Sequence, residues 1–425
     1  MSPEAQPEEL LADPPLAAAF SSPRVPHPRL LRVGSDTRGV LAFKFGGSSL
    51  LGAERMLHAA SLVREASCKA NVVVIVSAMK GVTDSLLSIA AALDAGRAAD
   101  ASREADHLFY VHFDVLRELR LDPFRAEQVA RDLRFLAKDL FHDVSERARA
   151  TFPSREALYD RLASYGERFS ARLFAAALEK SGVASVPVSS SEFVLTCNTF
   201  RDAQPHIEET RRRGREILLP LFADGLVPVV TGFIGSTVDG RVTTLGRNSS
   251  DFSGALVAHV VDADELVIWT DVDGVYTANP RESAEARLLH ELSYDQAHAL
   301  AASGAKVLHA KVLPLAAETE MVVWVRNTFN PRVRGTRIGP CATALATVGA
   351  QHVAPPLGTT APVPTCHSER SASSASGLPL ICHSERSESA AADERSRGIS
   401  PPSQLNDSLV SAPRGCHNSN SRGAA

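Results

Sequence analysis

The chain has 425 residues, of which 44% are hydrophobic and 22% are charged, and its formal net charge is −4. This composition is ordinary for a soluble globular protein, and the length favours two or more structural units. The charge gives no general attraction to nucleic acid or to an anionic membrane, so any phosphate binding must come from local sites.

The six cysteines show no paired CxxC spacing, and Cys68, Cys197 and Cys341 are far apart, which suits a reducing compartment. No stretch approaches the roughly 20 apolar residues that span a bilayer. Residues 1–38 are acidic and rich in proline, whereas a secretory signal has a basic start and an apolar run. We therefore expect a flexible leader, a cytoplasmic location, and neither membrane nor nucleic-acid partners.

The first ordered elements alternate between strand and helix. Val40–Phe45 is a short apolar run with one lysine, and it ends at Gly46-Gly47-Ser48-Ser49. The periodic segment Leu51–Ala66 predicts a helix. Val72–Val76 is β-branched throughout and apolar on both faces, which indicates a buried strand of a parallel sheet. Together these segments predict a βαβ unit.

The rest of the domain continues this alternation. Apolar spacings of three and four predict helices over 108–119, 124–149 and 158–179. Further strands are expected over 183–188, 227–231, 266–270 and 321–326. Phe233-Ile234 and Val242–Thr244 flank Asp239-Gly240, which predicts a hairpin. We predict one α/β domain over 39–340, a three-layer α/β/α sandwich with a mainly parallel central sheet.

After Gly339 the composition changes. Residues 341–425 are rich in Ser, Ala, Pro and Arg, and the hexapeptide CHSERS occurs at 366–371 and at 382–387. The segment is expected to be a disordered low-complexity tail, because it offers too little apolar surface to fold. The alternative, a Cys/His zinc site, is disfavoured because structural zinc ligands are separated by about two or more residues rather than adjacent.

Two clusters of small and polar residues follow the first two predicted strands. The Gly-Gly-Ser-Ser turn, with Lys44 on the strand before it, suits phosphate oxygens, although a plain tight turn remains the alternative. Ser77 to Asp84 follow the buried strand, where α/β proteins bind ligands. Here the alternative is a helix cap by Thr83 or Asp84.

Three further clusters carry charged or aromatic groups. Glu167 lies beside apolar periodic positions, so a helix-surface carboxylate is the plain alternative. Arg247, in the loop 245–253, can grip a carboxylate through two hydrogen bonds, although Ser250 or Asp251 there could simply cap a helix. The segment 269–281 combines Tyr276 for a base or ribose with Arg281 for phosphate, and 304–309 adds Lys306.

The order and wording of these six motifs resemble the aspartate kinase family of the amino acid kinase superfamily. Lys-Phe-Gly-Gly-Ser-Ser, Val-Ser-Ala, Tyr-Gly-Glu, Gly-Arg-Asn-x-Ser-Asp, Trp-Thr-Asp-Val-Asp-Gly-Val-Tyr-Thr and Gly-Ala-Lys-Val-Leu-His occur in that order. The resemblance extends from Phe43 to Gly339 and includes a last motif at Arg326–Pro331. The motif sequences are most similar to those in the kinase part of bifunctional aspartokinase–homoserine dehydrogenases.

The resemblance implies transfer of the ATP γ-phosphate to the β-carboxylate of L-aspartate, with ATP and Mg²⁺, as the first step of lysine, threonine and methionine biosynthesis. It implies that Glu167 pairs with the α-ammonium of aspartate and Arg247 with its α-carboxylate. The residues that it implies for catalysis are Lys44, Gly46, Gly47 and Ser48; for the acceptor Ser77, Thr83, Glu167, Arg247 and Ser250; and for ATP Lys44, Thr270, Asp271, Tyr276, Arg281 and Lys306. No metal ligand is assigned.

The chemistry fits this set. A β-carboxylate with an unperturbed pKa of about 3.9 is already ionised at neutral pH and needs no general base. Catalysis then reduces to in-line positioning and to neutralising charge with lysine and Mg²⁺.

Several residues depart from the family pattern, and two alternative functions are compatible with the sequence. Asn248-Ser249-Ser250 replaces a glycine-containing family pattern, so Ser249 would be strained if a positive φ is needed there. Asn279 and Ala310 also depart from the family pattern. Nothing in 341–425 resembles the ACT or dehydrogenase domains of full-length relatives, so we expect no feedback by lysine or threonine and at most a weak homodimer. The rivals are another amino acid kinase, such as an acetylglutamate or uridylate kinase, and a truncated non-catalytic nucleotide-binding fragment.

Overall fold

The computed structural model describes residues 39–145, 152–247, 249–278, 280, 283, 285–302, 308 and 311–340. The predicted leader 1–38 and the predicted tail 341–425 lie outside these residues, and both stay predictions. No helix in the described part of the chain is both long and apolar enough to cross a membrane.

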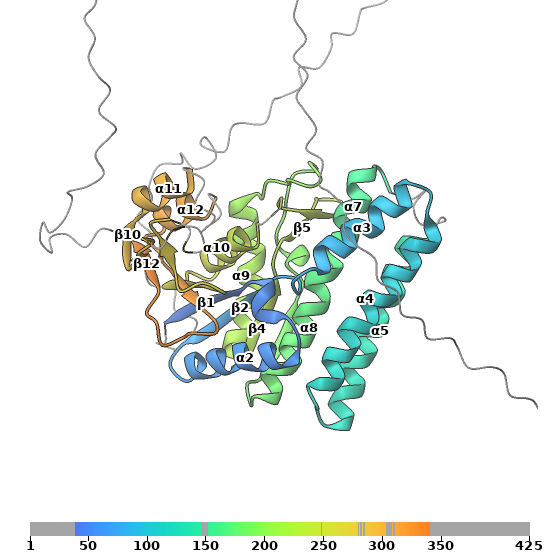
Figure 1. Cartoon of the computed structure of the whole chain (residues 1–425), viewed down its shortest axis with the longest axis horizontal. Helices are drawn as coiled ribbons and strands as arrows, with labels where there is room; N and C mark the ends of the chain where they lie inside the picture. The colour runs from blue at the N-terminus through green and yellow to red at the C-terminus, as the bar shows by residue number, and fades with distance from the viewer. Residues whose placement is uncertain are drawn as a thin grey trace, which may run out of the picture. The chain divides into compact units, whose positions relative to one another are not determined.

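An eight-stranded sheet forms the centre of the described chain, in the order β10-β12-β11-β7-β1-β2-β4-β3 (Figure 1). Six strands from β11 to β3 run parallel, whereas β12 is antiparallel to β11 and parallel to β10. The strands are β1 (Val40–Phe45), β2 (Asn71–Val76), β3 (Ser185–Val188), β4 (Val227–Thr231), β7 (Glu265–Thr270), β10 (Glu291–Ser293), β11 (Val322–Asn327) and β12 (Thr336–Gly339).

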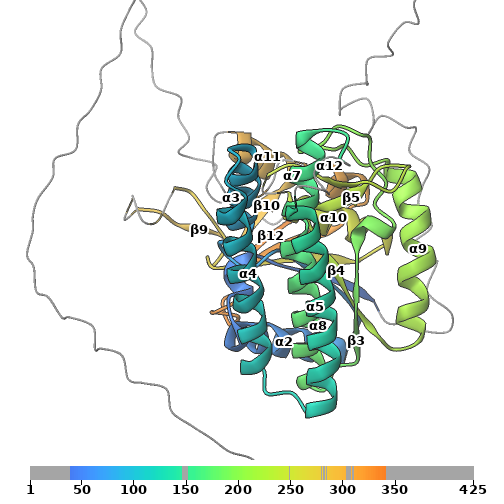
Figure 2. The same ribbon diagram turned by 90° about the vertical axis from the view of Figure 1, so that its right-hand side faces the viewer.

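Helices cover both faces of the sheet, and one hydrophobic cluster lies on each side. The helices packed with the first cluster are α2 (Ala53–Ser67), α3 (Val82–Asp94), α4 (Ala98–Glu118), α5 (Pro123–Val144), α7 (Arg155–Ala163) and α8 (Tyr165–Lys180). Those of the second are α9 (Ile207–Ala223), α10 (Ser250–Val260), α11 (Tyr294–Ala302) and α12 (Val312–Glu318). Figure 2 shows α3, α4 and α5 running alongside α8. The predicted three-layer sandwich is confirmed.

Residues of β1 and β2 alternate between the two clusters, as the pleat of a strand requires. Phe43 and Phe45 enter the first cluster, whereas Ala42 enters the second. Lys44 therefore shares the face of Ala42, on the side of α10. Because of this alternation, the only lysine of β1 packs toward α10.

The single helix predicted over 158–179 is wrong, because the structure has two helices that meet at Ser164. The Ser164 hydroxyl donates a hydrogen bond of 2.7 Å to the carbonyl of Arg161, three residues earlier. Such back-bonding competes with the regular helix ladder and bends helices. The two helices have different neighbours: α7 packs mainly against α3, whereas α8 packs mainly against α2, α5 and β3.

The other predicted elements are found with shifts of a few residues, except that the helix predicted over 108–119 is α4, which already begins at Ala98. The helix predicted to reach residue 149 ends at Val144, and the 146–151 segment lies outside the described residues. The predicted hairpin is β5 (Ile234–Ser236) with β6 (Val242–Thr244), and Gly240 has φ +81° at its turn. The pair β8 (Val275–Tyr276) and β9 (Leu288–Leu289) was not predicted, nor were β10 and β12, since two to four residues show no period.

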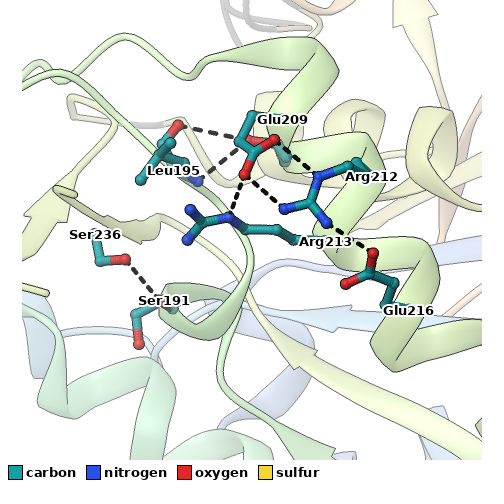
Figure 3. A network of polar contacts seen from close by, with 8 residues as sticks. Ser191, Leu195, Glu209, Arg212, Arg213, Glu216 and Ser236 are labelled. Atoms are coloured by element: carbon teal, nitrogen blue, oxygen red, sulfur yellow. Dashed lines mark hydrogen bonds and ion pairs between the residues drawn. The ribbon is translucent and has the colours of Figure 1, made fainter.

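The outer face of α9 carries surface ion pairs (Figure 3). Glu209 accepts hydrogen bonds from Arg212 and Arg213, which lower the pKa of its carboxyl to about 2, and Arg212 also donates to Glu216. Exposed pairs of this kind contribute little to stability. Arg212 and Arg213 are thus engaged in a solvated helix face.

Candidate active site

A cavity of about 490 Å³ lies at the carboxyl ends of the central strands. The strand β1 lies between β2 and β7. From β1 the chain continues to β2 on one side, and it later crosses to β7 on the other side, so the order of the strands reverses next to β1. Crevices of open α/β sheets form at such points. The cavity is lined by the segments that follow β1, β2 and β7 and by the start of α10.

The glycine turn follows β1 and leads into the short 3₁₀ helix η1 (Gly47–Leu50). The amide of Gly46 donates to the carbonyl of Trp269 over 3.2 Å, and the carbonyl of Gly47 accepts from the amide of Lys80 over 3.1 Å. A Cβ atom at Gly47 would lie 2.5 Å from the carbonyl oxygen of Ala78. Glycine is therefore required at this position by a close approach of two backbones.

Lys44 and Asp251 form an ion pair at the base of the cavity. The Nζ atom of Lys44 lies 2.7 Å from Oδ1 of Asp251, and Lys44 is only 7% exposed. The helix α10 reaches β1 because Gly254 leaves room, since a Cβ there would lie 3.2 Å from the Cβ of Lys44. The N-cap of α10 is Ser249, so the capping alternative for Ser250 and Asp251 is wrong.

The carboxyl group of Glu167 is buried in the first turn of α8. Its Oε1 accepts a hydrogen bond of 3.1 Å from the amide of Ala78, and Oε2 has no hydrogen-bond partner among the residues that the structure describes. Burial raises the pKa of Glu167 to about 8, and the hydrogen bond from Ala78 and the charge of Lys44 oppose this rise. Glu167 is 2% exposed, so the alternative of a helix-surface carboxylate is wrong.

Gly166 explains how Glu167 comes so close to the loop after β2. A Cβ at Gly166 would lie 2.6 Å from the Cβ of Ala78 and 3.2 Å from a methyl group of Val82. The small residue thus lets α8 pack against that loop, and this packing places the carboxyl group of Glu167 in the lining of the cavity. The Tyr-Gly-Glu motif therefore has a structural reason for its glycine.

One wall of the cavity was not predicted. The buried carboxylate of Asp160 accepts hydrogen bonds from the amides of Arg201 and Thr244, both 2.8 Å, and from the hydroxyl of Thr244 at 2.7 Å. Arg201 has φ +72°, and its guanidinium lies 5.1 Å from the ring centre of Tyr159. These contacts join segments 41 and 84 residues apart, and no local pattern in the sequence signals them.

Arg247 lies at the rim of the cavity in an exposed ion pair with Asp84, whose carboxylate is 3.2 Å away. The N-cap of α3 is Gly81, so Thr83 and Asp84 do not cap that helix, and both line the cavity. Ser249 has φ −79°, and the positive φ of this loop falls on Gly246, at +95°. The possible strain at Ser249 is therefore absent.

The cavity brings together ten of the predicted site residues. They are Lys44, Gly46, Gly47, Ser48, Ser77, Thr83, Glu167, Arg247, Ser250 and Asp271. Of the described residues predicted to bind nucleotide, Thr270 ends β7 and Tyr276 lies on β8, and both are outside the cavity lining. Arg281, Lys306, Asn279 and Ala310 lie outside the described residues. Lining residues missed from the sequence include Lys80, Asp160, Arg201 and Asp251.

The donor atoms of the cavity fit a magnesium ion that accompanies phosphate. Mg²⁺ is usually held by one or two carboxylates together with substrate phosphates and water. Asp271 lines the cavity, whereas the carboxylate of Asp251 is already paired with Lys44. Asp271 offers carboxylate oxygens of the required kind, and the bound ion would neutralise charge on the phosphates.

The two ends of the cavity offer different chemistry. The glycine turn and Lys44 supply backbone amides and a cation, which suit the oxygens of a phosphoryl group. Glu167, whose Oε2 has no hydrogen-bond partner among the described residues, suits an ammonium group, and Arg247 at the rim presents a guanidinium that suits a carboxylate. This arrangement can hold a phosphate donor and a small zwitterionic acceptor side by side.

Comparison with known proteins identifies the class that this fold and this cavity define. The model of the amino acid kinase family matches residues 40–327, and the chain belongs to that family. The chain is 34% identical to the lysine-sensitive aspartokinase 3 of Escherichia coli over 70% of its own length and 64% of that protein. It is 32% identical to the chloroplastic aspartokinase 1 of Arabidopsis thaliana over 71% of its own length and 52% of that protein.

Solved structures agree with this assignment. The crystal structure of E. coli aspartokinase III in complex with aspartate and ADP matches with a TM-score of 0.63 and 32% identity, over 71% of this chain and 64% of that one. The same protein in complex with lysine and aspartate matches with a TM-score of 0.62 and 31% identity, over the same shares. The chain thus spans about two thirds or less of the length of these relatives, and its particular likeness within the family is to aspartokinases.

Proposed function

We propose that this chain is an aspartate kinase that transfers the γ-phosphoryl group of ATP to the β-carboxylate of L-aspartate. The observation that carries the proposal is that one cavity is lined by the ion pair of Lys44 and Asp251, by the glycine turn and by Glu167, whose Oε2 has no hydrogen-bond partner among the described residues. The likeness to aspartokinases, one of them solved with aspartate and ADP, supports the same activity.

On the donor side, the amides of Gly46, Gly47 and Ser48 would hold phosphate oxygens, and Lys44 would stabilise the charge that spreads over the transferred group. Asp251 would hold the lysine ammonium in place through the 2.7 Å contact. The remaining proposed nucleotide contacts are Thr270, Asp271, Tyr276, Arg281 and Lys306.

On the acceptor side, Glu167 would pair with the α-ammonium of aspartate and Arg247 with its α-carboxylate. The exposed ion pair of Arg247 with Asp84 is weak enough to be exchanged for a substrate carboxylate. Ser77, Thr83 and Ser250 would supply the smaller polar contacts. Two charged anchors at one end of aspartate leave its β-carboxylate free to point toward Lys44.

The reaction itself needs little covalent help from the protein. The attacking β-carboxylate is ionised at neutral pH, so no general base has to remove a proton. The protein then contributes in-line positioning of the two substrates and a preorganised positive field. Mg²⁺, held by Asp271 and the phosphates, would add to that field.

A hydroxamate assay with aspartate, ATP and Mg²⁺ tests the proposal, because hydroxylamine traps the acyl phosphate product. We expect aspartyl hydroxamate from L-aspartate. With N-acetylglutamate or UMP, which lack the free ammonium that Glu167 would bind, we expect no acceptor-dependent release of ADP, a readout that also detects the UMP product, with which hydroxylamine does not react. ATP binding without any hydroxamate would support the rival of a non-catalytic nucleotide-binding fragment. Turnover of UMP or N-acetylglutamate instead would support a different amino acid kinase.

The proposed partners are thus ATP and L-aspartate, and the proposed place of the reaction is the start of lysine, threonine and methionine biosynthesis. A weak homodimer remains a prediction, which sedimentation of the purified chain would test.

A further inference from the structure

The segment Asn327–Asn330 begins at the last residue of β11 and lies against the glycine turn. The hydroxyl groups of Ser49 and Thr328 are 2.7 Å apart, although 279 residues separate them in the chain, and both residues are 0% exposed. Ser49 is the last residue of the Gly-Gly-Ser-Ser motif. A buried bond between two hydroxyl groups therefore ties the turn to the other end of the domain.

The backbone of Thr328 makes two further contacts, one with β7 and one with α2. Its amide donates to the carbonyl of Thr270 over 2.8 Å, and its carbonyl lies 2.7 Å from Nε2 of His58 on α2. The preceding carbonyl of β7, that of Trp269, accepts from Gly46. Consecutive carbonyls at the end of β7 thus hold the glycine turn on one side and Thr328 on the other.

The next residue strengthens the attachment. The ring of Phe329 stacks on His58 at 6.4 Å, and the guanidinium of Arg55 lies 4.9 Å from its centre. Arg55 also donates a hydrogen bond of 2.7 Å to the carbonyl of Ser48. The segment therefore orients the arginine that fixes another carbonyl of the turn.

The far side of the segment is fixed to the loop that follows β7. Oδ1 of Asp273 accepts hydrogen bonds from the side-chain amides of Asn327 at 2.8 Å and of Asn330 at 3.3 Å. The amide of Phe329 donates to the side chain of Asn327 over 2.9 Å. The segment is thus hydrogen-bonded to the glycine turn on one side and to the loop after β7 on the other.

We infer that Thr328 is a positioning residue for phosphoryl transfer, which acts through Ser49 to hold the glycine turn against the end of β7. The inference rests on the proposed kinase function. Thr328 does not line the cavity, so it reaches the substrates only through the turn. A turn released from this bond would place its amides less accurately, and positioning errors of about 1 Å can cost up to about a hundredfold in rate.

Thr328→Val in the full chain tests the inference, because valine keeps the shape and removes only the hydroxyl. We expect kcat to fall about tenfold, with a change of less than about twofold in the KM for aspartate. Thr328→Ser keeps the hydroxyl and should restore most of kcat. Ser49→Ala combined with Thr328→Val should cost no more than the larger single loss, because both changes remove the same bond.

Thr210→Val is the matched control. Thr210 is also 0% exposed, and its hydroxyl bonds to the backbone of Leu195, on the side of the sheet away from the first helical layer. It should lower the melting temperature about as much as Thr328→Val but leave kcat unchanged. Equal losses of kcat in the two variants, or a Thr328→Ser variant as slow as Thr328→Val, would overturn the inference.

Hydrogen exchange provides a readout that does not depend on turnover. Amide exchange in a peptide covering 46–50 should be about tenfold faster in Thr328→Val than in the parent, while Thr210→Val leaves it unchanged. Unchanged exchange of this peptide in Thr328→Val would contradict the inference even if the parent is active. An inactive parent with the expected exchange pattern would instead contradict the proposed function and leave the attachment of the turn supported.

Discussion

The ammonium group of Lys44 and the carboxylate of Asp251 lie 2.7 Å apart, with the lysine on the central strand β1 and the aspartate in the first turn of α10. The side chain of Lys44 is 9% exposed and that of Asp251 is 19% exposed. A pair so little hydrated is held firmly in one geometry. The lysine is thereby preorganised toward the glycine turn, and this arrangement supports several predictions.

Lys44→Met should lower kcat about 100-fold or more and leave the KM for aspartate within about threefold, because a lysine in the proposed role acts mainly on charge that develops in the transition state. Single-turnover and steady-state hydroxamate assays measure both. Lys69→Met, an exposed lysine after α2, is the control and should match the parent. Parent-like turnover of Lys44→Met would remove Lys44 from the phosphoryl group.

Asp251→Asn should also lower kcat, by about tenfold, since a neutral amide no longer fixes the ammonium of Lys44. The comparison variant is Asp262→Asn, which weakens ion pairs with Arg211 and Arg215 just after the other end of α10. It should reduce thermal stability slightly without affecting kcat. If both aspartate variants lose the same activity, the role of Asp251 is general stability and not lysine placement.

Arg247→Lys should raise the KM for aspartate about tenfold, because a single ammonium cannot make two parallel hydrogen bonds to a carboxylate. Arg241→Lys is a matched control, since Arg241 is a similarly exposed arginine in an ion pair with the nearby Asp239, at the hairpin of β5 and β6. That variant should be kinetically equal to the parent. An Arg247→Lys variant that is equal as well would place the acceptor carboxylate elsewhere.

The pH dependence of aspartate binding should report on Glu167. Its pKa of about 8 in the free protein means that the carboxyl is mostly protonated at pH 6 and must lose its proton to pair with an ammonium. We expect the KM for aspartate to rise about tenfold or more from pH 8.5 to pH 6. In Glu167→Gln the KM should be high and nearly constant over this range, and a parent-like slope there would assign the titration to another group.

The same group should affect stability in the absence of substrate. Because the folded protein holds the Glu167 proton more tightly than the unfolded chain does, its contribution to stability is lost as pH rises from 4.5 through about 8. Thermal melts of the parent and of Glu167→Gln across this window should therefore converge at low pH and diverge at high pH, with the variant more stable. Parallel curves would contradict the raised pKa.

The strands that carry the site were predictable from the sequence because of their composition. Val72–Val76 is apolar on both faces, and only a strand covered by helices on both sides buries such a run. The glycine turn and Lys44 were predictable because close backbone approach and charge each require a particular residue type. For Glu167 the sequence alone did not distinguish a surface carboxylate from a binding residue. The structure distinguishes them, because the close packing of Gly166 against the loop after β2 buries the side chain of Glu167.

The remaining parts of the site depend on contacts that no local pattern records. Asp160 lies on the short helix α7, and its role appears only when Thr244, 84 residues away, folds against it. The break at Ser164 was missed because apolar spacing continues through it. Thr328 belongs to the Arg326–Pro331 motif, but its contact with Ser49 could not be predicted, because the two residues lie 279 positions apart in the chain.

The placement of Lys44 on the central strand has a consequence for how acceptor preference can change. The strand β1 is paired along both edges, so the lysine belongs to the least adjustable part of the sheet. Arg247 and Arg201, by contrast, come from connecting loops at the mouth of the cavity. Loops tolerate replacement far better than paired strands. A redesign toward another small carboxylate can therefore exchange the loops and keep the phosphoryl-transfer half intact.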